Sequence, residues 1–332
     1  MAKQTYSGVR RRIRGSAHIR ELAAAVHLSH RDFIQPLFVD ESIDRRTEIP
    51  SLSGIASDTP ESLLRQISAD VECGVRKFLL FPVPANKAEG NFDYRFICGV
   101  VRDIRTHFGK EVWIAVDVCL CAYTSHGHCG ILNTERNAVL HADTAQALAG
   151  YAVQLADAGA DCIAPSDMMD GRVGAIRDAL DLHGMTEVTV MSYSSKFSSQ
   201  FYGPFRDACH SAPGRGTLLK DRKTYQISPF NGGDALLSAF RDIEEGADII
   251  MVKPALPYLD VITGLKRQVH HPVAAYHVSG EYQGLELLVQ HGLADRAKVH
   301  TEVWAALKRG GADIIISYAA RHAEEWISGI EY

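Results

Sequence analysis

A tripeptide that recurs along the chain most constrains its fold. Gly-Ala-Asp stands at 159–161, 246–248 and 311–313, each time after a segment with helical spacing and before a short apolar run. Glycine adopts the left-handed conformation at little cost and therefore ends helices. Repetition of helix, Gly-Ala-Asp and strand is typical of stacked β/α units. The pattern predicts an α/β protein built from successive strand and helix pairs.

Eight apolar runs are predicted to be strands, and several are continuously hydrophobic, as parallel strands covered on both faces must be. Eight β/α units in about 300 residues close most naturally into a (β/α)8 TIM barrel, with the chemistry at the C-terminal ends of the strands. The alternative is an open doubly wound sheet, but no glycine-rich dinucleotide fingerprint follows the first predicted strand. The predicted strands are 78–81, 113–117, 162–165, 188–192, 224–227, 249–253, 273–278 and 314–318.

The chain divides into two predicted parts. Residues 1–30 carry an arginine cluster at 10–14 and a short amphipathic segment at 19–26, but no predicted strand. We interpret them as an extended N-terminal arm that packs on another subunit. Residues 31–332 form the predicted catalytic barrel, in which the long loop at about 197–224 has the length and composition of a lid.

Composition excludes several classes of protein. The formal charge of −5 and the single basic cluster argue against a nucleic-acid surface. No apolar run approaches the ~18 to 20 residues of a membrane span, and the N-terminus lacks the apolar core of a signal peptide, so we expect no membrane partner and a cytoplasmic location. Seven cysteines, an odd and low number, argue against a disulfide framework.

Two lysines are candidate nucleophiles. Lys253 ends the apolar run I-I-M-V-K-P, where loss of hydration should lower its pKa and leave an amine able to form a Schiff base. Lys196, in M-S-Y-S-S-K-F, would disfavour protonation of Lys253 if both side chains point into one mouth. The alternative is a structural lysine in a salt bridge across the barrel.

The stretch at 115–130, A-V-D-V-C-L-C-A-Y-T-S-H-G-H-C-G, is a candidate metal site. Thiolate and imidazole are the ligands that Zn²⁺ selects, although the spacing C-x-C then C-x₇-C is only moderately specific. One alternative is a closed structural site with His126 or His128 as the fourth ligand. The other is an open, catalytic site on Cys119, Cys121 and Cys129 alone, which the neighbouring lysines favour.

Seven long strings, in the same order across about 200 residues, resemble the 5-aminolevulinate dehydratase (porphobilinogen synthase) family. The resemblance implies a (β/α)8 barrel whose arm embraces a neighbouring subunit, usually in a homo-octamer built from dimers. It also implies the condensation of two 5-aminolevulinate molecules to porphobilinogen with loss of two waters, an early step of tetrapyrrole (heme) biosynthesis. The strings are D-V-C-L-C-A-Y-T-S-H-G-H-C-G (117–130), A-P-S-D-M-M-D-G-R (164–172), M-S-Y-S-S-K-F (191–197), F-Y-G-P-F-R-D-A (201–208), M-V-K-P (251–254), Y-H-V-S-G-E (276–281) and A-D-I-I-I-S-Y (312–318).

The same resemblance implies roles for single residues. Lys253 should form the Schiff base with the substrate that becomes the propionate side, and Lys196 with the acetate-side substrate. The acetate-side carboxylate should contact Arg206, Arg222 and Gln226, and the other carboxylate Ser279 and Tyr318. Phe81, Tyr202 and Phe205 should line the pocket, and Asp117 and Ser166 should approach the acetate-side amine.

The resemblance also implies a zinc ion. Family members without zinc carry aspartates where this chain has Cys119, Cys121 and Cys129, so the chain resembles the zinc-dependent type, with the metal acting as a Lewis acid. His126 and His128 are then expected around the thiolates and not on the metal. Many bacterial relatives also bind an allosteric Mg²⁺. Whether this chain binds one is left open, no ligand is assigned, and Arg241 could replace the ion as a fixed positive charge.

Two other functions fit parts of the pattern. A class I Schiff-base aldolase shares the barrel and the lysine, but it needs neither zinc nor a second lysine. A zinc-stabilised barrel that only binds a ligand would keep the cysteines without using the lysines. Loss of turnover on chelation, restored by Zn²⁺, separates the dehydratase from the aldolase.

Overall fold

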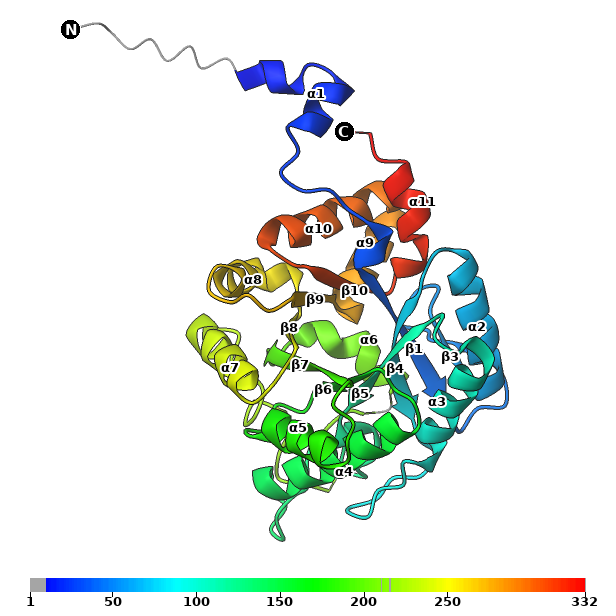
Figure 1. Ribbon diagram of the computed structural model, residues 1–332, viewed down its shortest axis with the longest axis vertical. Helices are drawn as coiled ribbons and strands as arrows, with labels where there is room; N and C mark the ends of the chain where they lie inside the picture. The colour runs from blue at the N-terminus through cyan, green and yellow to red at the C-terminus, as the bar shows by residue number, and fades with distance from the viewer. Residues whose placement is uncertain (1–9, 210, 215, 332) are drawn as a thin grey trace, which may run out of the picture.

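Eight parallel strands close into a barrel in the computed structural model, which describes residues 10–209, 211–214 and 216–331 (Figure 1). Each strand pairs with the next along the chain, and the last pairs with the first through Phe33 and Ile315, which closes the ring. The predicted (β/α)8 barrel is therefore confirmed. The barrel strands are β1 (Phe33–Asp40), β4 (Lys77–Val83), β5 (Trp113–Val118), β6 (Cys162–Pro165), β7 (Thr189–Lys196), β8 (Ile249–Lys253), β9 (Val273–His277) and β10 (Ile314–Ser317).

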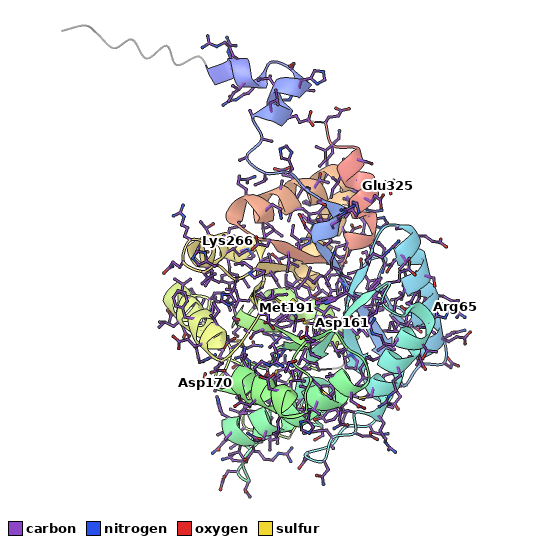
Figure 2. The ribbon with its side chains drawn as sticks, viewed as in Figure 1. Arg65, Asp161, Asp170, Met191, Lys266 and Glu325 are labelled. Carbon is purple, nitrogen blue, oxygen red and sulfur yellow. The ribbon has the colours of Figure 1, made fainter. Side chains whose placement is uncertain are left out.

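Helices surround the strands, and side chains fill the space among them, with Met191 of β7 in the middle of the molecule (Figures 1 and 2). Two short strands, β2 (Thr47–Glu48) and β3 (Ala56–Asp58), extend the sheet beside the C-terminal half of β1. No helix in the described part of the chain is long and apolar enough to cross a membrane. The helices are α1 (Ala17–Leu22), α2 (Pro60–Glu72), α3 (Arg95–Phe108), α4 (His141–Asp157), α5 (Arg172–Leu182), α6 (Gly203–Ala208), α7 (Gly232–Glu244), α8 (Leu259–Lys266), α9 (Ser279–Gln290), α10 (Arg296–Gly310) and α11 (Ala323–Ser328).

The Gly-Ala-Asp tripeptide has the same structure at all three positions. Its glycine is left-handed, with φ of +105° at Gly159, +100° at Gly246 and +114° at Gly311, where a side chain would be strained. Its aspartate accepts a hydrogen bond from the backbone N–H of a residue at the start of the preceding strand, at 2.7–2.8 Å. The glycine of the tripeptide therefore ends one helix, and its aspartate links the strand that follows to the preceding strand of the barrel. These aspartate bonds link Asp161 to Ile114, Asp248 to Val190 and Asp313 to Val273.

The predicted strand at 224–227 is wrong, because that segment forms turns and touches the sheet only through a single bridge between Phe197 and Ile227. The missing eighth strand is β1, which was not among the predicted strands. Proline lacks the N–H that a central strand needs, and Pro36 lies in the middle of β1. The structure accommodates it because β10 pairs with β1 only at Phe33 and Ile34, before the proline.

The start of the described arm, residues 10–22, lies away from the barrel, and the chain reaches α10 and α11 at Val26 and Leu28 (Figure 1). The arm contains a 3₁₀ helix at Arg10–Arg14 and the six-residue α1, which is shorter than the predicted amphipathic segment at 19–26. The Ser16 side chain caps α1 by accepting a hydrogen bond from the N–H of Ile19. Leu22 is 82% exposed, and no residue of α1 is buried. Contacts within this chain therefore contribute little to the stability of α1.

Candidate active site

The two predicted lysines lie side by side. Lys196 is the last residue of β7 and Lys253 the last of β8, and their Cα atoms are paired in register. Both side chains are about nineteen-twentieths buried, with exposed fractions of 5% and 4%. The Lys196 ammonium donates a hydrogen bond to the carbonyl oxygen of Ser166 at the end of the adjacent strand. The barrel therefore brings two amines into one buried space at the C-terminal ends of its strands.

A β-bulge in β7 decides where Lys196 points. In a regular strand Tyr193 and Lys196, three residues apart, would face opposite sides. The register against β8 shifts between Ser192 and Ser195, which inserts one extra residue. The two serines bond outward to α7, through the Asp242 carboxylate at 2.6 Å and the carbonyl of residue 235 at 2.7 Å. Tyr193 and Lys196 consequently both face inward, with the ammonium 5.5 Å from the ring centre.

Aromatic rings enclose the amine of Lys253. Burial, the largest cause, and the neighbouring charge of Lys196 together lower the pKa of Lys253 to about 7. Ring faces favour an ammonium, so desolvation and like-charge repulsion outweigh these contacts. A large share of this amine is therefore neutral and nucleophilic near neutral pH, as the sequence predicts. The distances from Nζ to the ring centres are 4.1 Å for Tyr276, 4.8 Å for Tyr193, 5.0 Å for Phe205, 5.6 Å for Tyr202 and 5.7 Å for Phe81.

Arg172 is fully buried and contacts both the bulge of β7 and the loop after β6, whose Ser166 carbonyl binds Lys196. Arg172 donates to both carboxylate oxygens of Asp242, at 3.1 and 3.0 Å, and to the hydroxyl of Ser192 at 3.0 Å. It also faces the Asp167 carboxylate at 3.5 Å, next to the Ser166 carbonyl that binds Lys196. This cluster was not among the predicted site residues, because its members meet only when α5, α7 and β7 are packed together.

The three predicted cysteines form a buried cluster in the loop after β5. Their sulfur atoms all lie within 4.8 Å of one another. Hydrogen bonds from the other two thiols lower the pKa of Cys129, whereas burial raises the pKa of Cys119. A soft divalent cation binds thiolates and displaces their remaining protons, so these donors suit a metal ion. The cluster could hold one.

The two histidines of this loop make other contacts. Nδ1 of His126 accepts the backbone N–H of His128 at 3.1 Å. The ring of His128 uses both nitrogens, one with the Tyr225 hydroxyl at 3.0 Å and one with the Leu219 carbonyl at 3.1 Å. Because both ring nitrogens of His128 already have partners, His128 lies beside the cysteines and is not a fourth metal ligand in this geometry.

The long loop after β7 packs directly on the cysteine loop. Arg222 donates to the carbonyls of Gly127, at 2.9 Å, and Ser211, at 2.7 Å. A Cβ at Gly127 would lie 2.5 Å from the carbonyl oxygen of Ala212, so only glycine fits this contact. The Tyr225 hydroxyl adds a bond from the N–H of Cys129 at 3.4 Å. The loop therefore covers the cysteines.

Three residues of this cover carry unsatisfied polar atoms. Nε of Arg206, Nε of Arg222 and the amide of Gln226 are buried and have no hydrogen-bond partner among the described residues. Oδ1 of Asp117 is in the same state, and burial raises the pKa of that carboxyl. Buried polar groups without partners are unfavourable, and a polar ligand would satisfy them. The two guanidinium groups suit a carboxylate.

The other predicted carboxylate ligands, Ser279 and Tyr318, come from segments that follow Lys253 in the sequence. Ser279, the first residue of α9, accepts the N–H of Phe205 at 3.1 Å. Tyr318 follows β10, and its hydroxyl accepts a hydrogen bond from Tyr276 at 3.3 Å. The Tyr202 hydroxyl donates to the carbonyl of Lys253 at 2.9 Å. Phe81, Tyr202 and Phe205 therefore lie around Lys253, and Ser279 and Tyr318 contact this aromatic group through Phe205 and Tyr276. Gln226 follows the long loop, and its N–H donates to the carbonyl of Arg222.

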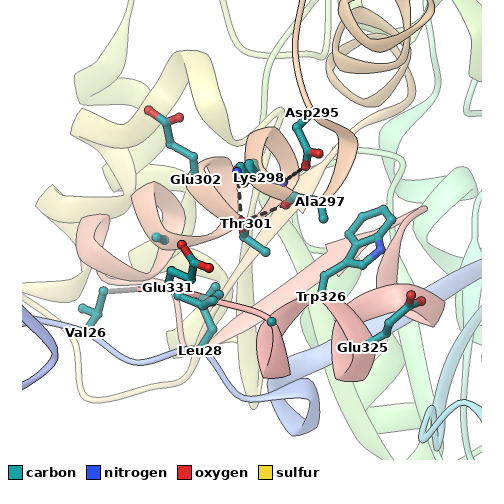
Figure 3. A pocket seen from close by; sticks show the side chains of 13 residues that line it. Val26, Leu28, Asp295, Ala297, Lys298, Thr301, Glu302, Glu325, Trp326 and Glu331 are labelled. Carbon is teal, nitrogen blue, oxygen red and sulfur yellow. Dashed lines mark hydrogen bonds between the residues drawn. The ribbon is translucent and has the colours of Figure 1, made fainter. Parts of the chain in front are cut away.

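A separate pocket of about 750 Å³ lies where the arm meets α10 and α11 (Figure 3). Val26 and Leu28 line it on one side and Trp326 on another, with Glu302 and Glu331 among its acidic side chains. It contains none of the paired lysines or clustered cysteines. We therefore assign the chemistry to the barrel interior and not to this pocket.

Comparisons with known proteins agree with this geometry. A family model described as Delta-aminolevulinic acid dehydratase matches residues 8–326. The delta-aminolevulinic acid dehydratase of Bacillus subtilis (strain 168) is 39% identical over 322 residues, covering 96% of this chain and 97% of the relative. That of Helicobacter pylori (strain J99) is 42% identical over 317 residues, covering 94% and 96%. A crystal structure of delta-aminolevulinic acid dehydratase (porphobilinogen synthase) from Toxoplasma gondii ME49, in complex with the reaction product porphobilinogen, matches with a TM-score of 0.89 and 36% identity, covering 96% of this chain and 90% of the other.

Proposed function

Because the chain belongs to the delta-aminolevulinic acid dehydratase family, we infer that it condenses two molecules of 5-aminolevulinate to porphobilinogen with loss of two waters. It is accordingly a hydro-lyase of tetrapyrrole (heme) biosynthesis. The observation that carries this function is the pair of buried lysines at neighbouring strand ends, since each substrate has one ketone.

Lys253 is the first candidate nucleophile. Its neutral amine attacks a ketone carbon, and loss of water from the addition product leaves an imine, which activates the neighbouring carbon for bond formation. Lys196 would bind the second substrate in the same way, with its ammonium held by the Ser166 carbonyl in the free enzyme. We assign the propionate-side substrate to Lys253 and the acetate-side substrate to Lys196.

The charged ends of the substrates need partners of opposite charge. The unsatisfied atoms of Arg206, Arg222 and Gln226 support a contact with the acetate-side carboxylate. Ser279 and Tyr318 would bind the other carboxylate with their hydroxyl groups. The three rings of Phe81, Tyr202 and Phe205 would exclude water, and Asp117 and Ser166 would hold the acetate-side amine.

We assign the metal of the cysteine cluster as zinc. Three buried thiols with no histidine ligand match the sulfur preference of Zn²⁺ and leave one coordination position for a substrate. A bound zinc ion supplies a Lewis acid beside the acetate-side substrate. A magnesium ligand stays unassigned, and Arg241 already holds Asp170 and Asp242 as a fixed positive charge.

The proposed reaction has a direct test. The purified zinc-loaded protein should convert two equivalents of 5-aminolevulinate into one of porphobilinogen, measured by the colour that porphobilinogen gives with an aldehyde reagent. A class I aldolase would give no such product and would keep its turnover in a chelator. Consumption of 5-aminolevulinate without porphobilinogen would contradict the assignment.

We also propose that the arm joins subunits into a homo-octamer. Ile13 and Leu22 are 48% and 82% exposed, which is unfavourable for an arm that stays alone. The arginines at 10–14 would complement acidic side chains such as Glu302 and Glu331 beside the pocket of Figure 3, if the arm of one copy lies against another.

Deleting residues 1–30 should therefore reduce the native mass from that of an octamer to that of a dimer, as measured by light scattering during gel filtration. Leu22→Ser should shift the population in the same direction. Leu182→Ser is the matched control, since Leu182 is 84% exposed on α5 and outside the arm. An unchanged number of subunits after the deletion would rule out the arm as the connector.

A further inference from the structure

Three tyrosine rings surround the amine of Lys253, and their hydroxyl groups differ in one respect. The Tyr202 hydroxyl donates to the carbonyl of Lys253, and the Tyr276 hydroxyl donates to that of Tyr318. The Tyr193 hydroxyl is buried and makes no well-formed hydrogen bond within the part of the chain that the structure describes, although the Asp117 carboxyl lies close enough to raise its pKa further. Among these tyrosines, only Tyr193 therefore keeps a free donor next to the nucleophile.

The position of Tyr193 is built into the strand. The bulge turns its side chain inward, and the outward bonds of Ser192 and Ser195 to α7 hold the bulge in place. The ring centre lies 4.8 Å from the nitrogen of Lys253 and 5.5 Å from that of Lys196, so the residue stands between both amines. Burial, the largest cause, raises the pKa of Tyr193, which keeps its hydroxyl protonated at neutral pH.

Imine formation needs a donor at this place. As the nitrogen attacks the ketone carbon, the C–N bond forms, and the electron pair of the C=O π bond moves to oxygen. The oxygen then takes the two protons that the nitrogen loses and leaves as water. A donor already aimed at this oxygen stabilises the transition state more than the ground state, because the negative charge develops there.

We propose that Tyr193 is a further catalytic residue, whose hydroxyl donates a hydrogen bond to the ketone oxygen of the substrate attacked by Lys253. This inference rests on the proposed Schiff-base function of Lys253. The unpaired hydroxyl of the free enzyme acquires its partner when the substrate enters, which explains why an unsatisfied donor is kept in a buried site.

Tyr193→Phe tests the proposal, because it removes the hydroxyl and keeps the ring over both amines. The rate at which borohydride traps 5-aminolevulinate on Lys253 should fall about 100-fold, the usual effect of losing one such donor, and kcat should fall with it while KM changes little. The melting temperature should change little, since the lost hydroxyl made no well-formed hydrogen bond; a merely structural tyrosine would lower it.

Tyr151→Phe is the matched control, since Tyr151 is a buried tyrosine of α4 whose hydroxyl bonds to Tyr123 at 3.0 Å. Its trapping rate should equal that of the unmodified protein. If the unmodified protein traps no substrate on Lys253, the proposed function fails. If it does, and Tyr193→Phe traps at the same rate or only loses thermal stability, the inference about Tyr193 is overturned.

Discussion

Replacing Lys253 by methionine is expected to lower porphobilinogen formation by about 10⁴-fold or more, because the reaction then lacks its nucleophile. Methionine keeps an unbranched chain of similar length among the same rings, so the fold should persist. Mass spectrometry after borohydride reduction with 5-aminolevulinate should show the added mass on the Lys253 peptide of the unmodified protein and none at residue 253 of the variant.

Lys110→Met is the control for this experiment. Lys110 is 84% exposed and pairs with Asp161 at the surface, so turnover should stay unchanged. Substantial turnover by Lys253→Met, or an adduct confined to another lysine in the unmodified protein, would contradict the assignment of Lys253.

The same substitution should raise stability at acid pH. The pKa of Lys253 is about 7 in the folded state and near its ordinary value of 10.5 in an unfolded chain. Between these values the unfolded state binds more protons, so stability rises with pH through this window and carries the full penalty below about pH 7. Removing the charge should therefore stabilise the variant by on the order of 4 kcal/mol at pH 6, with a gap that narrows toward pH 10. Melting temperatures at several pH values measure this gap.

Removing the metal is expected to lower turnover by about 100-fold or more, because the acetate-side substrate loses its Lewis acid. Chelation should abolish most of the activity and zinc should restore it. Cys129→Ser should have the same effect without rescue, and the protein should hold less than one zinc ion per chain by elemental analysis. Trapping on Lys253 should survive, since that amine lies among aromatic rings and not among the thiols.

Cys73→Ser serves as the control, because Cys73 is an exposed cysteine outside the cluster. It should keep both the metal content and the turnover of the unmodified protein. Full activity in protein shown to be free of metal would refute a catalytic role for the cluster. A loss of thermal stability with activity retained would indicate a structural site.

The sequence by itself determined the repeat and the reactive residues. Glycine ends helices through its own backbone freedom, and Gly159, Gly246 and Gly311 therefore marked the units of the barrel. Lys253 lies at the end of a strand with no other charge, so its lowered pKa follows from local burial. Cys119, Cys121 and Cys129 lie within one short loop, so their clustering needs few long-range contacts.

Only the tertiary structure decided how these parts face one another. The strand at 33–40 contains Pro36, which has no N–H to donate. Whether a strand tolerates this loss depends on where the neighbouring strands pair with it, and only the structure shows that. The inward direction of Lys196 and Tyr193 depends on a bulge, which arises from the register between β7 and β8 and from the contacts of two serines with α7. Local periodicity cannot encode an extra residue in one strand of a pair. The placement of Tyr193 beside Lys253 therefore follows from packing between distant segments, while the chemistry of each residue was already present in the chain.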